Sequence, residues 1–189
     1  MRLGEWLLSK VAEEASEVSH ACHKGLIHGL LDNEPGTNLT VAEQVVGEYW
    51  DLVYVSLFLK AYLAQTGSES INFFRFPDHA LTPEQETARF YKQSKVTVML
   101  FWSVHLGVVK LTDEDKVFLK NHILSKIWST PDDKEKILSW AFTAHSWFEN
   151  IIAMAERRGE AKLLADWGHI RAGVNSVLDN EFQLNIVSI

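Results

Sequence analysis

Cysteine is almost absent from this sequence of 189 residues. Cys22 is the only one, so the chain cannot form an internal disulfide. A protein without disulfides fits a reducing compartment, and the start of the chain is acidic and amphipathic instead of resembling a signal peptide. We therefore expect a cytoplasmic location. Because Cys22 falls on an apolar stripe of the first predicted helix, we expect a buried structural thiol and not a nucleophile.

Proline is also scarce, and its four positions all fall between stretches of helical periodicity. Periodic stretches with proline confined to the connections are typical of an all-α protein. We expect a helical bundle that forms a single domain over residues 1–189. An acidic helix pair would occupy residues 1–66, and additional helices in residues 83–189 would form a C-terminal extension that packs on it. The prolines are Pro35, Pro77, Pro83 and Pro131.

The sequence has neither a long hydrophobic run nor an excess of positive charge. The longest apolar run, residues 52–59, contains a serine and is too short to span a bilayer, so we expect no membrane partner. The net charge of −7 argues against a general nucleic-acid binder, which normally carries a basic patch. It does not exclude a nucleotide substrate, because a bound metal supplies local positive charge. Glycine-rich phosphate loops of the Walker A and GxGxxG types are missing as well.

Apolar spacing, capping residues and helix breakers together predict six helices. Thr40 and Glu43 form a candidate capping box for the second helix, and Gly67 marks its end. Thr82 is expected to cap the third helix. The predicted helices cover about residues 3–31, 40–66, 83–110, 112–129, 130–158 and 160–178. A tail over 181–189 could pack as an extended arm on the body or on a second subunit.

Two groups of acidic residues lie in the first two predicted helices. Glu13, Glu14 and Glu17 belong to the first helix, and Glu48 and Asp51 belong to the second. Residues three or four apart share one face of a helix, so Glu14 and Glu17 point the same way. The same spacing relates Glu48 to Asp51. Like charges one turn apart repel each other, more strongly when buried, so a counter-charge is needed, and a divalent metal ion is the simplest one.

Apolar neighbours place these acids close to the expected core. The stripe of the first helix that we expect to face the core consists of Leu7, Val11, Ala15, Val18 and Cys22. The neighbouring stripe, which we call the acidic stripe, borders the core-facing one and consists of Lys10, Glu14, Glu17 and Ala21. In the second helix the acids interrupt apolar rows that include Val41, Val45, Leu52, Val55, Phe58 and Leu59. Burying an unpaired carboxylate costs several kcal/mol or forces its protonation. Four carboxylates converging from two helices would suit Mg²⁺, with water and substrate phosphate completing its coordination.

The pattern EExxE at residues 13–17, followed by ExxD at residues 48–51, resembles the MazG-like all-α nucleoside triphosphate pyrophosphohydrolases. The resemblance covers roughly residues 3–66. It implies a helical bundle, usually a dimer or a dimer of dimers, that uses Mg²⁺ or sometimes Mn²⁺ to hydrolyse NTPs or dNTPs to the monophosphate and pyrophosphate. Glu13 or Glu17 would take the proton of the attacking water. The metal ligands that the resemblance implies are Glu14, Glu17, Glu48 and Asp51.

Five residues outside the metal ligands are candidates for substrate contact. Lys10 could bind a phosphate, although an ion pair with Glu14 one turn later is an equally good interpretation. Trp6 could stack on a base, and core packing is its alternative. A basic cluster at the start of the third helix could anchor the triphosphate or form a solvated helix face. Its members are Arg89, Lys92 and Lys95.

Two other functions remain open. A non-catalytic helical interaction protein could carry the same acids as a solvated face. A di-iron carboxylate bundle would need two Glu-x-x-His pairs. Glu17 and His20 supply one, and Asp166 with His169 is the only possible second pair, with aspartate in place of glutamate. For the pyrophosphohydrolase, two helices with exposed apolar surface would be completed by a second copy, so we expect a homodimer or homotetramer.

Overall fold

The computed structural model of the protein describes residues 1–33, 38–67, 81–124 and 161–183. The helix predicted over residues 130–158 and the end of the predicted tail lie outside these ranges. Within them the chain is helical apart from short connections, with a single isolated bridge between Asn33 and Thr40. The predicted all-α class is therefore confirmed.

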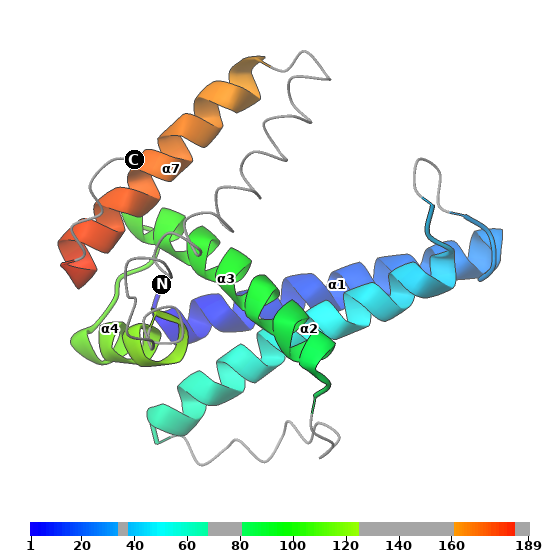
Figure 1. The fold of residues 1–189 in the computed structure, drawn as a ribbon, viewed down its shortest axis with the longest axis horizontal. Helices are drawn as coiled ribbons and strands as arrows, with labels where there is room; N and C mark the ends of the chain where they lie inside the picture. Colours follow the sequence, from blue (N-terminus) through cyan, green and yellow to red (C-terminus); the bar gives the residue numbers. More distant parts are fainter. Residues whose placement is uncertain (34–37, 68–80, 125–160, 184–189) are drawn as a thin grey trace. The chain divides into compact units, whose positions relative to one another are not determined.

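The helices follow the predicted order (Figure 1). Those that the structure describes are α1 (Leu3–His28), α2 (Val41–Gln65), α3 (Pro83–His105), α4 (Asp113–Leu119), the π-helical segment η2 (Lys120–Leu124) and α7 (Ala161–Phe182). Among these described helices, none combines the length and the apolar character that crossing a bilayer requires.

Glycines with a positive φ follow two helices that end earlier than predicted. α1 ends at His28 instead of residue 31, and Gly29 has a φ of 95°. α3 ends at His105 instead of residue 110, and Gly107 has a φ of 71°. Glycine has no Cβ, so it adopts this left-handed conformation without a steric cost. α7, by contrast, continues past its predicted end at residue 178.

Side chains that bond to the backbone fix the starts of α2, α3 and α4. The backbone nitrogen of Thr40 donates to Glu43 Oε2 at 2.8 Å, and the backbone nitrogen of Glu43 donates to Thr40 Oγ1 at 3.2 Å. The capping box predicted for α2 is therefore confirmed. Thr82 and Gln85 exchange the same two bonds at the start of α3. A third box, which was not predicted, begins α4.

The chain separates into two compact units. One unit is Gly4–Gln93, which we call the acidic unit because it contains both acidic motifs. The second unit consists of Met1–Leu3 and Ser94–Ile189. The division falls inside α3 and not in the connection before it. The first turns of α3 therefore belong with the acidic helix pair.

In the acidic unit, α1 and α2 lie side by side and run in opposite directions (Figure 1). A Cβ built on Gly4 would lie 2.9 Å from the Tyr62 ring, close to the start of α1 and the end of α2. A Cβ built on Gly25 would lie 3.5 Å from Val41, close to the connection between the helices. The two helices are thus in contact near both ends, which places the acidic motif of α1 beside that of α2.

The buried face of α1 differs from the predicted one. Leu7 is buried as expected, but Ala15 and Cys22 are exposed, and Glu14 and Ala21 are buried instead. The prediction of a buried Cys22 thiol is therefore wrong. Glu14 can face inward because it has a buried cationic partner, described below.

The second unit is held together by contacts among α3, α4 and α7. The rings of Phe101 and Phe182 lie 5.4 Å apart, which joins the end of α3 to the end of α7. Gly173 lies so close to α3 that an added Cβ would be 2.6 Å from the Trp102 ring. Lys116 of α4 forms an ion pair with Glu181 of α7 at 2.9 Å.

Candidate functional site

The helix pair brings three of the predicted metal ligands together. Glu14 and Glu17 come from α1 and Glu48 from α2, and each offers one carboxylate oxygen within 4.8 Å of the other two. Glu14 is buried, with only 5% of its surface exposed, whereas Glu48 is half-buried and Glu17 is exposed. This acidic cluster therefore extends from the edge of the core to the solvent.

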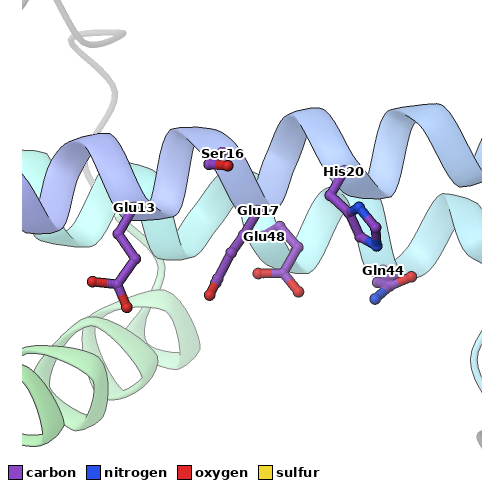
Figure 2. Close-up of a pocket in the computed structure, with 6 residues that line it drawn as sticks. All are labelled: Glu13, Ser16, Glu17, His20, Gln44 and Glu48. Atoms are coloured by element: carbon purple, nitrogen blue, oxygen red, sulfur yellow. The ribbon is translucent and has the colours of Figure 1, made fainter.

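An open pocket adjoins the acidic cluster, with a volume of about 560 Å³. Figure 2 shows the carboxylates of Glu17 and Glu48 next to each other near its middle, with Glu13 toward one end and His20 toward the other. The volume is in the range of small-molecule sites in proteins. The described residues that line the pocket are Glu13, Ser16, Glu17 and His20 of α1 with Gln44 and Glu48 of α2.

Asp51, the fourth predicted ligand, does not join the acidic cluster and binds Lys92 instead. Lys92 Nζ donates to Asp51 Oδ2 at 2.7 Å and to Glu14 Oε2 at 2.9 Å. Only 8% of Lys92 is exposed. The predicted phosphate contact of Lys92 requires an open ammonium group, whereas in this structure the ammonium group lies between two carboxylates.

Burial and neighbouring charges shift the pKa of both partners. Burial raises the pKa of Glu14, with Lys92 acting against this shift and the charges of Glu17 and Asp51 adding to it. Burial lowers the pKa of Lys92, but its hydrogen bonds to Asp51 and Glu14 outweigh that effect, so its pKa is raised overall. Lys92 is therefore protonated at neutral pH. Its single charge offsets only part of the negative charge of four carboxylates.

The donor set of the acidic cluster fits a hard divalent cation. Carboxylate oxygens are preferred ligands of Mg²⁺ and Mn²⁺. Mg²⁺ binds oxygen at about 2.0–2.1 Å, so two oxygens on one ion lie at most about 4.2 Å apart. The three oxygens of Glu14, Glu17 and Glu48 lie within 4.8 Å of one another, so small side-chain rotations would bring them into that range. The negative charge left after pairing with Lys92 also favours such an ion.

Glu13, Lys10 and Trp6 form a chain of contacts along α1. Glu13 lines the pocket outside the acidic cluster, and Lys10 pairs with Glu13 and not with Glu14 as one interpretation expected. Lys10 Nζ lies 5.6 Å from the centre of the Trp6 ring. Only 4% of Trp6 is exposed. This arrangement matches the packing interpretation of Trp6.

The three basic residues of α3 have different environments. Lys92 faces the interior of the acidic unit, as described above. Arg89 forms an ion pair with Glu86, and its buried Nε has no hydrogen-bond partner. Lys95 is half-buried and belongs to the second unit. The sequence pattern grouped them because they follow one another along the helix, but the structure does not give them one common role.

Three polar residues of the pocket were not predicted as part of it. The sequence pattern assigns no function to Ser16 or Gln44, and it assigns His20 only to the di-iron alternative. Gln44 Oε1 is buried without a hydrogen-bond partner. Helical spacing could have identified two of them, because Gln44 precedes Glu48 by one turn and His20 follows Glu17 by one turn. The other half of the di-iron pattern, Asp166 and His169, lies on α7 in the second unit.

The site thus combines three converging carboxylates, a buried ammonium group and an open polar pocket. Such a set can bind a divalent cation and, next to it, a polar ligand that carries negative charge. No protein-family model, no curated protein and no solved structure shows a significant match to this chain.

Proposed function

We propose that this protein is a Mg²⁺-dependent nucleoside triphosphate pyrophosphohydrolase that acts on the nucleotide pool of the cytoplasm. The supporting observation is the meeting of Glu14, Glu17 and Glu48 beside one pocket. Spacing along the sequence relates acids only within a single helix, whereas this cluster joins two helices. The reaction is the one that the resemblance to the MazG-like family implies. The acidic cluster would bind the cation that this reaction needs.

We assign metal binding and proton transfer to different residues of the pocket. Glu14, Glu17 and Glu48 would hold Mg²⁺, which offsets the negative charge on the phosphate oxygens during phosphoryl transfer. Glu13 lies in the same pocket outside the acidic cluster, and Lys10 binds only its Oε2, so its other carboxylate oxygen would orient a water molecule and accept its proton. The water attacks the α-phosphorus, pyrophosphate leaves, and the nucleoside monophosphate is released. No covalent intermediate with the protein forms.

Polar groups at the pocket would bind the rest of the substrate. Lys10 is the best placed of the predicted phosphate contacts, because its partner Glu13 lines the pocket. Ser16, His20 and Gln44 offer hydrogen-bonding groups for the sugar or the base. Arg89 remains a candidate for charge compensation, whereas Lys95 belongs to the second unit. Trp6 would have to become accessible before it could stack on a base.

Exposed apolar side chains on α1 support a homodimer or homotetramer. Leu8, Leu26 and Ile27 are 57%, 84% and 75% exposed. Transferring such side chains from water to a protein interface is favourable. A second copy of the chain would provide that interface.

The proposal is tested by incubating the purified chain with Mg²⁺ and each of the NTPs and dNTPs. We expect the monophosphate and pyrophosphate from at least one of them, and no product in excess EDTA. Glu48→Gln should reduce the rate by at least about 100-fold, because it removes a ligand of the cation. Glu114→Gln is the matched control, since Glu114 is an exposed acid on α4 in the second unit, and it should leave the rate unchanged.

Each alternative function predicts a different result. Release of inorganic phosphate instead of pyrophosphate would contradict the proposed bond cleavage. Absence of turnover together with absence of metal uptake would favour the non-catalytic interaction protein. An oxidised iron chromophore in the purified protein would favour the di-iron bundle.

A further inference from the structure

Lys92 occupies a position that a metal ion could otherwise take. Its Nζ lies 2.9 Å from Glu14 Oε2 and 2.7 Å from Asp51 Oδ2, so one cation already bridges an acid of α1 and an acid of α2. The bridging residue itself comes from α3. Because Lys92 is only 8% exposed, this bridge forms part of the interior of the acidic unit.

A divalent ion between the same two oxygens would conflict with this ammonium group. It would have to approach each oxygen to about 2.0–2.1 Å, within contact distance of Lys92 Nζ. Two positive charges that close repel each other strongly away from bulk water. Moving Lys92 away would leave the negative charges of Glu14 and Asp51 without the positive charge that lies between them. Metal binding at Asp51 is therefore opposed for as long as Lys92 stays in place.

We infer that the ammonium group of Lys92 prevents Asp51 from binding a metal ion. The site is then limited to one divalent ion, bound by Glu17, Glu48 and Glu14. Glu14 can serve both cations, because a carboxylate has two oxygens and Lys92 contacts only Oε2. This inference rests on the proposed function, since it assigns the stoichiometry of the same metal site. It departs from the four-ligand set that the sequence motif implies.

The experiment is a titration of the full-length protein with Mn²⁺, in which free Mn²⁺ is measured by electron paramagnetic resonance. The unaltered protein should bind one ion per chain. Asp51→Asn should still bind one ion and should lose at least tenfold less affinity than Glu48→Gln. Lys92→Met should bind a second ion per chain, because it frees Asp51 and one oxygen of Glu14. Circular dichroism confirms that each variant is folded.

Several outcomes would overturn the inference. Two tight Mn²⁺ ions in the unaltered protein would show that Lys92 does not exclude one. An Asp51→Asn variant that loses as much affinity as Glu48→Gln would make Asp51 a metal ligand. Both results leave the proposed metal-dependent hydrolysis intact, whereas absence of any Mn²⁺ binding would overturn that function as well. If Lys92→Met does not fold, the unaltered protein and Asp51→Asn still decide between these outcomes.

Discussion

Lys92 connects α1, α2 and α3 through a single nitrogen atom. Of its two partners, Glu14 is buried, whereas the side chain of Asp51 is 37% exposed. A charge at the surface can be solvated when it loses its partner, but a buried one cannot. The stability of the acidic unit should therefore depend on the pair between Lys92 and Glu14 more than on the pair with Asp51.

Lys92→Met should destabilise the protein by about 3–5 kcal/mol, the usual cost of removing one partner from a buried ion pair. Unfolding in urea, followed by circular dichroism, measures the loss. Lys10→Met is the matched control and should cost less than Lys92→Met, because its partner Glu13 is 48% exposed and can be solvated when the pair is lost. The double variant Lys92→Met with Glu14→Gln should regain part of the loss. A double variant less stable than Lys92→Met would contradict this explanation.

Glu13→Gln should separate proton transfer from metal binding. Because Glu13 lies in the pocket outside the acidic cluster, the variant should lower kcat by about 100-fold or more and keep its affinity for Mn²⁺. Steady-state kinetics and the Mn²⁺ titration together measure both effects. Equal losses of kcat and metal affinity would instead make Glu13 part of the metal site.

At the residue scale, spacing along one helix predicts which of its side chains share a face, but it does not predict contacts between distant helices. Helical spacing predicted that Glu14 and Glu17 share a face, and both do join the acidic cluster. The partner of Asp51 could not be predicted, because Lys92 lies 41 residues away and periodicity within one helix carries no information about which distant helix packs on it. The exposure of Cys22 was missed for the same reason.

At the scale of whole elements, the capping box of α2 predicts a pH dependence. The hydrogen bond from the backbone of Thr40, followed by the one from its hydroxyl, lowers the pKa of Glu43 in the folded protein. A lowered pKa in the folded state means that the carboxylate stabilises the fold above the unfolded-state pKa of about 4.3, and that this contribution disappears as the pH falls through the folded-state value. Glu43→Gln keeps the capping geometry but does not titrate.

The urea midpoints of the unaltered protein and of Glu43→Gln should therefore differ by a constant amount from neutral pH down to about pH 5. Below about pH 4 the difference should shrink, because Glu43 becomes protonated. A difference that stays constant down to pH 3 would show that the charge of Glu43 does not contribute to the cap.

Two glycines in helices allow a matched test of packing. A Cβ on Gly173 of α7 would lie 2.6 Å from the Trp102 ring and 2.7 Å from the His105 ring, so Gly173→Ala should destabilise the protein by about 1–3 kcal/mol. Nothing lies within 4 Å of a Cβ on Gly47 of α2. Gly47→Ala should therefore stabilise the protein by about 0.5–1 kcal/mol, through helix propensity alone. Thermal unfolding measures both, and a neutral Gly173→Ala would contradict the close approach of α7 to α3.

How accurately a helix boundary can be predicted depends on how clearly the neighbouring residues in the sequence mark it. The start of α2 was correct because Thr40 and Glu43 form the cap within a few residues. The end of α3 was placed too late because Gly107 lies in an otherwise apolar run that continues the helical pattern. The change to a π-helix at Lys120–Leu124 has no local signature that we recognise in the sequence.

At the scale of the whole molecule, α1 offers a test of self-association. Leu26→Glu should leave the stability of an isolated chain within about 0.5 kcal/mol, because Leu26 is 84% exposed. If a second copy covers this face, the same variant should shift the protein from dimer to monomer in analytical ultracentrifugation. His28→Glu, on the opposite side of α1, should not. A monomeric unaltered protein at all concentrations would contradict the expected homo-oligomer.

The division of the chain inside α3 has a consequence for how such a protein can diverge. A helix turns by about 100° per residue, so one residue inserted between Gln93 and Ser94 would rotate everything after it relative to Lys92. Lys92 would still meet Glu14 and Asp51, and Trp102 would still meet Gly173, because the members of each contact lie on the same side of the insertion. Among descendants of this gene we therefore expect substitutions at Lys92 to accompany changes at Glu14 or Asp51, and substitutions at Trp102 to accompany changes at Gly173, without coupling between the two groups.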